Sequence, residues 1–367
     1  MRICFYNVTA SFIPGGLETY CWEAGRALAR RGHEVTIVAG DRGGPWHDEV
    51  KLVQFPFRIE QAWPDFGTRF RRLMERLSFA RHSLDHLVRA QYDAVIVNKP
   101  FDFPILWRAR RRAMRSQTLF RSGGTDFYAG DRAFAGAVMH WVSASAYNAR
   151  QIEARYRRRV TVIHNGVDTG VFHPRPHHDG ERQRLGAGPG DMLMVSVGRL
   201  VGWKGVRIVL DALARTPAHV RYLVVGSGPE EENLKRQAQA LGLSARVQFF
   251  GRVPHAALPG ILSQSDLFVQ PSIGEEAFGI SVVEAMACGL PVLASNNGGL
   301  PEIVVEGETG RLLPPGDAAA WARAIADLAA KPHALAALAS RARARAEAKF
   351  TWAENAALLE AIFMEKR

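Results

Sequence analysis

The chain has 367 residues, of which 47% are hydrophobic and 23% are charged. This composition suits a folded protein of two domains and excludes an intrinsically disordered chain. The formal net charge is +11, and all of the excess lies in residues 1–165, which hold 26 lysines and arginines against 15 acidic residues. No run of about 18 uncharged apolar residues occurs, so we expect no transmembrane helix.

Three cysteines, Cys4, Cys21 and Cys288, are present, and no C-x-x-C pair occurs. We therefore expect buried free thiols and a reducing, cytoplasmic compartment. The first residues, MRICFYNVTASF, do not form a secretory signal peptide, because Asn7 and Thr9 interrupt a short apolar run.

Short apolar segments alternate with helical patterns along the first half of the chain. They are rich in Val and Ile without strict alternation, which indicates strands buried on both faces of a parallel sheet. The predicted strands are 3–8, 34–40, 50–55, 93–98, 118–121, 140–145 and 160–164. A helix over 17–31 follows the first strand and ends before Gly32.

The pattern restarts after residues 173–191, a segment rich in Pro, Gly and charge that has no apolar period. Predicted strands are 193–198, 222–226, 247–251, 266–270 and 291–295. Predicted helices lie between them at about 204–215, 229–241, 255–264 and 279–288. Ala-rich helices follow over 317–348, and an amphipathic helix capped by Thr351 runs over 351–363.

Strands separated by helices predict the α/β class, with two Rossmann-like parallel-sheet domains that face each other across a cleft. We place the first domain at residues 1–168, completed by the C-terminal helix at about 351–367. The second domain is then 169–350. A ligand would bind at the carboxyl ends of the strands.

The strongest chemical pattern is PSIGEEAFGISVVEAMACGLPVLAS, in which Glu276 and Glu284 stand eight residues apart. Gly279 lies near the start of a predicted helix, and the free N–H groups of a helix start bind anions. The loop formed with Ala277 and Phe278 can therefore bring backbone N–H groups to a phosphate or a sugar hydroxyl. Glu284 suits the two hydroxyls of a ribose, and Glu276 suits hydroxyls of a transferred sugar.

Two cations, Arg199 and Lys204, follow a predicted strand in VGRLVGWKG. Fixed cations at the carboxyl end of a strand suit the two charges of a diphosphate leaving group. No DxD-type acidic pair for Mg²⁺ or Mn²⁺ occurs at a strand end. We therefore expect neither a metal ion nor another cofactor.

Glycine pairs follow two further strands. Gly226 and Gly228 lie in VVGSGPE, without the third glycine of a dinucleotide fingerprint. This turn either lets a nucleotide approach the backbone or simply joins a strand to a helix. Gly15 and Gly16 precede the first helix, where they either make room for a ligand or form a tight turn.

Together these segments resemble the retaining glycosyltransferases of the GT-B fold, family 4, also called glycosyl transferases group 1. The resemblance covers nearly the whole chain, through GGLETYCWEAGRALARRGHEV, VIHNGVD, VGRLVGWKG, VVGSGPE, FFGRV and the two-glutamate segment. It implies retaining, metal-independent transfer from a nucleotide diphosphate sugar. The implied roles are diphosphate binding by Arg199 and Lys204, ribose binding by Glu284, donor-sugar binding by Glu276 with 277–279, and a place near the distal phosphate for Gly16.

One position departs from the family pattern. The family usually has a histidine in a pattern like His-Gly-Thr-Asp-Phe, and the corresponding residue here is Gly123, in Gly-Gly-Thr-Asp-Phe. By resemblance, that histidine contacts the donor sugar near the reacting centre, so its loss concerns the acceptor side and activity itself. The candidates to replace it are Asp126, Arg121 and Lys99, and spacing does not choose among them.

The basic first half has two clusters of arginines. The first lies in a predicted helix over 69–90, largely off its apolar stripe, and comprises Arg69, Arg71, Arg72, Arg76 and Arg81. The second comprises Arg108, Arg110, Arg111, Arg112 and Arg115. A basic amphipathic helix can lie on an anionic bilayer, so we expect peripheral contact with the inner membrane face. The alternatives are a helix packed on the sheet and an arginine-rich surface without a partner. Nucleic acid is not expected, since no recognition helix or aromatic platform is evident.

The sequence thus predicts a glycosyltransferase that moves a hexose from UDP, GDP or another nucleotide to a cell-surface glycan or a lipid-linked intermediate such as lipopolysaccharide. Two alternatives stay open. One is another GT-B nucleotide-sugar enzyme, such as an epimerase or phosphorylase. The other is a catalytically silent nucleotide-sugar-binding partner subunit, which the missing histidine would favour.

Overall fold

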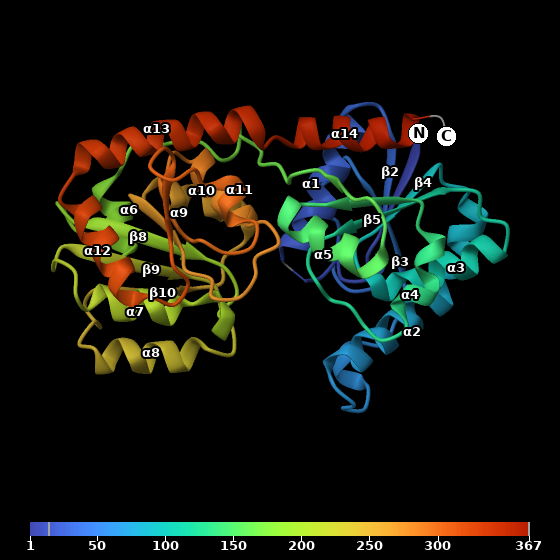
Figure 1. Ribbon diagram of the computed structural model, residues 1–367, viewed down its shortest axis with the longest axis horizontal. Coiled ribbons are helices and arrows are strands. Elements are labelled where there is room, and N and C mark those ends of the chain that lie inside the picture. Colours follow the sequence, from blue (N-terminus) through green and yellow to red (C-terminus); the bar gives the residue numbers. More distant parts are fainter. Residues whose placement is uncertain (14, 366–367) are drawn as a thin grey trace. The chain divides into compact units, whose positions relative to one another are not determined.

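The computed structural model describes residues 1–13 and 15–365, and the chain divides into two compact units (Figure 1). The first unit comprises Met1–Gly166 with Trp352–Arg367, and the second comprises Val167–Thr351. Each unit holds one parallel sheet with helices on both faces, as predicted from the Val-rich and Ile-rich strands.

The sheet of the first unit has seven strands in the order β3-β2-β1-β4-β5-β6-β7. The strands are β1 (Arg2–Tyr6), β2 (Glu34–Gly40), β3 (Lys51–Phe55), β4 (Ala94–Val97), β5 (Gln117–Ser122), β6 (His140–Ser143) and β7 (Thr161–Val162). Successive side chains of a strand point to opposite faces. In β1, Ile3 and Phe5 therefore pack in one core, and Cys4 and Tyr6 pack in the other.

Helices cover both of these cores. Helices α1 (Gly16–Arg30) and α14 (Trp352–Met364) pack against each other on the Ile3 face. The opposite face is covered by α2 (Thr68–Ala90), α3 (Phe103–Arg111) and α5 (Ala146–Tyr156). The shorter elements are η1 (Glu60–Ala62), η2 (Pro100–Asp102), α4 (Asp131–Phe134) and η3 (Ala135–Ala137).

The sheet of the second unit has six strands in the order β10-β9-β8-β11-β12-β13. They are β8 (Met192–Val197), β9 (Val220–Val225), β10 (Val247–Gly251), β11 (Leu267–Gln270), β12 (Val292–Ser295) and β13 (Gly310–Leu313). The edge strand β13 was not predicted, because GRLL is short and carries a charge. Gly310 lets it approach its neighbour, since a Cβ there would lie 1.9 Å from the Val292 oxygen.

Most helices of the second unit follow the predicted alternation, although those over 179–184 and 300–303 were not predicted. The helices are α6 (Asp179–Arg184), η4 (Gly202–Lys204), α7 (Val206–Leu213), α8 (Glu231–Ala240), η5 (His255–Ala257), α9 (Leu258–Ser263), α10 (Ile280–Ala287), α11 (Leu300–Ile303), α12 (Ala318–Ala329) and α13 (Pro332–Lys349). No helix among the described residues combines the length and the hydrophobicity that crossing a membrane requires. The three cysteines are free and buried, as expected.

Helix α2 differs from its predicted pattern at Arg76. The sequence placed this arginine off the apolar stripe, but it is buried and forms an ion pair of 2.6 Å with Asp102. It also donates to Asn7 over 3.3 Å. A partner charge and an amide offset the cost of burying a guanidinium, and hydrophobic periodicity does not reveal such partners.

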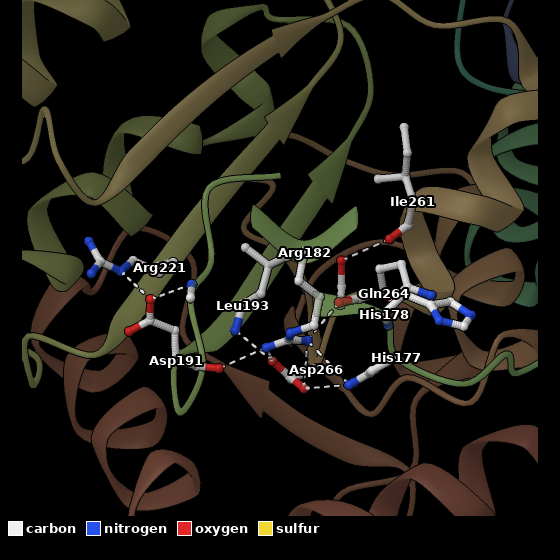
Figure 2. A network of polar contacts seen from close by, with 11 residues as sticks. His177, His178, Arg182, Asp191, Leu193, Arg221, Ile261, Gln264 and Asp266 are labelled. Carbon is white, nitrogen blue, oxygen red and sulfur yellow. Dashed lines mark hydrogen bonds and ion pairs between the residues drawn. The ribbon is translucent and has the colours of Figure 1, made fainter. Parts of the chain in front are cut away.

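Helix α6 lies within the segment that was predicted to be irregular, and Arg182 ties it to the sheet (Figure 2). The Arg182 guanidinium donates to the backbone oxygens of Gln264 at 2.7 Å and Asp191 at 2.8 Å. It also pairs at 2.9 Å with Asp266, which accepts from the amide of Leu193 in β8 at 2.7 Å. Because α6 is anchored by a charge, it shows no apolar period.

We expect Arg182→Ala to lower stability by about 3 kcal/mol, since breaking a buried ion pair costs about 3–5 kcal/mol and Asp266 keeps some exposure. The shift in the urea midpoint of unfolding measures this loss. The control is Arg184→Ala, an exposed position of the same helix, where a change below about 0.5 kcal/mol is expected. Equal losses in the two variants would contradict an anchoring role for Arg182.

Candidate functional site

The residues predicted to bind a donor gather at the carboxyl edge of the second unit's sheet. Arg199 and Lys204 follow β8, and Glu276 follows β11, the hydrogen-bonded neighbour of β8. Parallel neighbours bring the loops after their carboxyl ends to one edge of the sheet. A small cavity at this edge is lined by residues that include Gly198, Arg199, Lys204, Gln270 and Pro271.

Glu276 is the centre of this group and is 8% exposed. Its Oε1 atom accepts hydrogen bonds of 2.9 Å from both Gln270 Nε2 and Ser272 Oγ, and Lys204 forms an ion pair with the same atom. Three donors offset the cost of burying a carboxylate and fix its orientation. Among the described residues, no hydrogen bond involves the Oε2 atom, which can therefore accept one from a ligand hydroxyl.

Sequence reasoning did not identify Gln270 and Ser272 as part of this site. Gln270 ends a buried strand, and Ser272 follows it, so their polar side chains at a strand end were the available signal.

The loop that carries Lys204 is locked to the loop after β11. The amides of Ile273 and Gly274 donate to the Trp203 oxygen at 2.8 and 3.1 Å. Gly205 follows with φ +72°, and a Cβ there would lie 1.9 Å from the Pro271 oxygen. Glycine is therefore required for this approach, which places Lys204 beside Glu276.

Arg199 contrasts with Lys204. It is exposed, and its side chain has no hydrogen bond or ion pair within the described part of the chain. Its guanidinium is therefore available to an anionic ligand.

Glu284 lies in α10 and is 5% exposed. Its Oε1 atom is 2.6 Å from Nε2 of His255 in η5. Sequence reasoning missed His255, because the contact joins residues 29 positions apart and no local pattern marks it. A ribose bound by Glu284 would share or replace this hydrogen bond.

The loop before α10 offers backbone groups more than side chains. Phe278 is buried against Phe350, with the ring centroids 5.8 Å apart. Gly279 caps α10 with φ +116° and no side-chain hydrogen bond, and Ala277 has no polar side chain. A ligand contact of residues 277–279 would thus come from their N–H groups.

Gly226 and Gly228 bring the loop after β9 against the loop after β8. A Cβ at Gly226 would lie 1.9 Å from the Gly198 oxygen, and one at Gly228 would lie 2.2 Å from the Leu200 oxygen. Both glycines are therefore needed for backbone packing. The contact of Gly226 with a nucleotide stays a prediction.

In the first unit, Lys99 and Asp126 form an ion pair, and Arg72 lies 3.3 Å from Asp126. Burial favours the protonated form of Asp126, but the charges of Lys99 and Arg72 outweigh it and lower the pKa of this carboxyl. Asp126 is therefore an anion held between two cations.

Arg121, in β5, is the candidate whose side chain reaches position 123. A Cβ at Gly123 would lie 3.4 Å from Arg121 Nη1 and 2.9 Å from Leu17 Cδ1, and no atom of Lys99 or Asp126 lies within 4 Å of it. Arg121 is thus the candidate nearest to position 123, and which of the three residues replaces the histidine stays a prediction.

The glycines before α1 lie beside an acidic side chain. Gly15 caps the helix without a side-chain hydrogen bond, and Gly16 is its first residue. A Cβ at Gly15 would lie 2.7 Å from Glu18 Oε2, and Glu18 Oε1 accepts a hydrogen bond of 2.5 Å from Thr9. Gly15 thus makes room for Glu18, and the phosphate contact of Gly16 stays a prediction.

Within residues 1–13 and 15–365, no group of three or more His, Cys, Asp and Glu side chains is arranged to hold a metal ion.

Family models match both halves of the chain. Residues 14–171 match the Glycosyltransferase Family 4 model, and residues 178–345 match Glycosyl transferases group 1. A GDP-mannose-dependent alpha-(1-6)-phosphatidylinositol monomannoside mannosyltransferase of Mycolicibacterium smegmatis is 27% identical over 98% of this chain and 98% of its own length. A D-inositol 3-phosphate glycosyltransferase of the same organism is 38% identical over 54% of this chain and 46% of its own length.

Solved structures share the fold along the whole chain. Anabaena HepE, solved in complex with UDP and glucose, has a TM-score of 0.83 at 24% identity and is covered over 100% of both chains. WaaG, a glycosyltransferase involved in lipopolysaccharide biosynthesis, has a TM-score of 0.78 at 18% identity over 99% of this chain and 100% of its own. With both halves matched in order and the two-sheet architecture shared, the chain belongs to the glycosyltransferases of the GT-B type.

Proposed function

We propose that the protein transfers a hexose from a nucleotide diphosphate sugar to an acceptor hydroxyl, with retention of the anomeric configuration and without a metal ion. The observation that carries this proposal is that Arg199 and Lys204 line one small cavity and that Lys204 also pairs with the buried carboxylate of Glu276. Such a site combines positive charge for a leaving diphosphate with a fixed acceptor for sugar hydroxyls.

In the proposed reaction, the acceptor hydroxyl attacks the anomeric carbon on the face from which the diphosphate leaves. The bond from that carbon to the phosphate oxygen breaks, the new glycosidic bond forms, and the hydroxyl proton passes to the leaving oxygen. The negative charge that builds up on the diphosphate is stabilised by Arg199, Lys204 and the N–H groups that begin α10.

Lys204 has a double role in this proposal. Its ammonium group contacts Glu276 and would also contact the diphosphate. When the Lys204 ammonium group contacts both Glu276 and the diphosphate, Glu276 still accepts hydrogen bonds from Gln270 and Ser272. Phosphate binding and sugar binding therefore depend on one contact between two loops.

For the acceptor, we propose a cell-surface glycan or a lipid-linked intermediate such as lipopolysaccharide, reached from the cytoplasm at the inner membrane face. The relative that matches along the whole chain is named for a phosphatidylinositol monomannoside. The arginine cluster of α3 and the residues after it is exposed and suits anionic headgroups: Arg108, Arg110, Arg111, Arg112 and Arg115. Trp107 is also exposed, and the guanidinium carbon of Arg111 lies over its ring, 4.6 Å from the centroid.

One observation favours a second candidate, a catalytically silent subunit that binds the nucleotide sugar. Position 123 carries no side chain where the family usually has a histidine. Such a subunit would bind a nucleotide but form no product, so binding and turnover must be measured separately.

We expect Lys204→Ala to weaken nucleotide binding and to reduce kcat/KM at least about 100-fold, because loss of one such donor removes about 3 kcal/mol of transition-state stabilisation. Thermal unfolding with UDP, GDP and their sugar conjugates measures binding. A nucleotide at 100 times its Kd should stabilise the wild type by about 2.7 kcal/mol.

The matched control is Lys235→Ala in α8, which removes the same charge from a surface pair with Glu231. It should keep both the nucleotide response and turnover. Unchanged turnover in Lys204→Ala would exclude the diphosphate role. A nucleotide response without turnover in the wild type would favour the silent subunit.

We also expect transfer to continue in EDTA and to give a product with the anomeric configuration of the donor. The physical reason is that side-chain cations replace a divalent ion at the diphosphate. The coupling constant of the anomeric proton in the NMR spectrum of the product measures the configuration. Strict dependence on Mn²⁺, or an inverted product, would contradict the proposal.

Binding to anionic liposomes tests membrane contact. Each arginine near an anionic surface contributes about 1 kcal/mol, so replacing Arg108, Arg111 and Arg115 by Ser should weaken binding about 100-fold at low salt. The control replaces three exposed arginines of the second unit by Ser: Arg207, Arg215 and Arg323. Absence of wild-type binding at low salt, or equal loss in both variants, would remove the membrane proposal.

A further inference from the structure

The described part of the chain has three buried arginines, and they differ in their partners. Arg76 pairs with Asp102, and Arg182 pairs with Asp266. Arg121 is the most buried, at 2% exposure, and no carboxylate pairs with it among the described residues. Burying a cation is costly unless an anion compensates it. Arg121 is therefore the exception that needs an explanation.

The groups around Arg121 compensate its charge only in part. One guanidinium nitrogen donates to the amide oxygen of Asn165, and the guanidinium carbon lies 3.8 Å from the centroid of the Tyr20 ring. The Nε atom is buried without a hydrogen bond. Burial lowers the pKa of Arg121, so its surroundings stabilise the charged guanidinium less well than water does.

The Nη1 atom of Arg121 faces the space beside Gly123. A Cβ at Gly123 would lie 3.4 Å from Nη1 and 2.9 Å from Leu17 Cδ1, in the first turn of α1. That helix has 15 residues and no side-chain cap, so its first N–H groups also favour an anion. The acidic residue in this first turn, Glu18, accepts a hydrogen bond from Thr9 and forms no ion pair with Arg121.

We propose that Arg121 binds an anionic group of the acceptor, a phosphate or a carboxylate, on the solvent side of the exposed Gly123. A guanidinium binds both groups through paired N–H donors. The inference rests on the proposed function, in which Arg199 and Lys204 already serve the donor diphosphate. The missing histidine at position 123 concerns the acceptor side, so we assign Arg121 to the acceptor.

In the first test, a substitution at position 123 gives Arg121 a carboxylate partner from the protein itself. Gly123→Asp places a carboxylate beside Nη1, and Gly123→Asn places an uncharged group of the same size there. Leu17 Cδ1 is the end of a flexible side chain and can move aside. In chloride buffer, we expect Gly123→Asp to unfold at a temperature about 2–4 °C above Gly123→Asn, a visible shift for a domain of this size. If the two unfold at the same temperature, the charge of Arg121 is already compensated and the proposal is wrong.

Inorganic phosphate is the external probe, used at constant ionic strength in a Lys204→Ala background that weakens the donor site. Phosphate should raise the unfolding temperature when Arg121 and Gly123 are intact, and the response should fall in Arg121→Gln and Gly123→Asp. An equal response in all three would overturn the proposal.

Nucleotide binding, measured with Lys204 intact, separates the two possible sources of the anion. If Arg121→Gln abolishes the response to UDP or GDP, Arg121 serves the donor and the acceptor assignment is wrong. If it loses only the phosphate response, the assignment is supported. If no nucleotide stabilises the wild type while phosphate does so through Arg121, the proposed function fails and the anion site remains.

Discussion

Parallel strands that are buried on both faces leave polar side chains few positions in which to act. In each unit, helices cover the two faces of the sheet, and the charges of the candidate donor site in the second unit stand in loops beyond the strands. The loops after β8, β9 and β11 meet at one edge because their glycines allow backbone atoms to approach closely. The contact between Lys204 and Glu276 depends on that approach, and the proposed chemistry depends on the contact.

The charge of the chain is arranged differently in its two halves. Some cations of residues 1–165 are engaged inside the first unit, where Arg76 and Lys99 are paired with acids. Arg108, Arg110, Arg111, Arg112 and Arg115 remain exposed. The positions of these exposed arginines, rather than the net charge alone, therefore indicate where this half can meet an anionic partner.

Regular burial could be predicted from the sequence, and specific long-range pairing could not. The Val-rich and Ile-rich segments located every strand except β13, which is too short and polar to stand out. The two-glutamate segment and the cations after β8 marked one edge of the second sheet, although their roles stay predictions. Periodicity did not show α6, which is anchored by Arg182, or the contact between His255 and Glu284. Such pairs join residues that are distant in the sequence, and each partner alone resembles a surface residue.

The locked loops after β8 and β11 have a consequence for how this protein can evolve. Gly205 has no side chain to offer a substrate, yet any side chain there would collide with the Pro271 oxygen and displace Lys204 from Glu276. Selection on turnover would therefore conserve Gly205 as strictly as a residue that touches the donor. Changes of donor preference would then accumulate at positions away from these closely packed glycines, such as the neighbourhood of His255, which contacts Glu284.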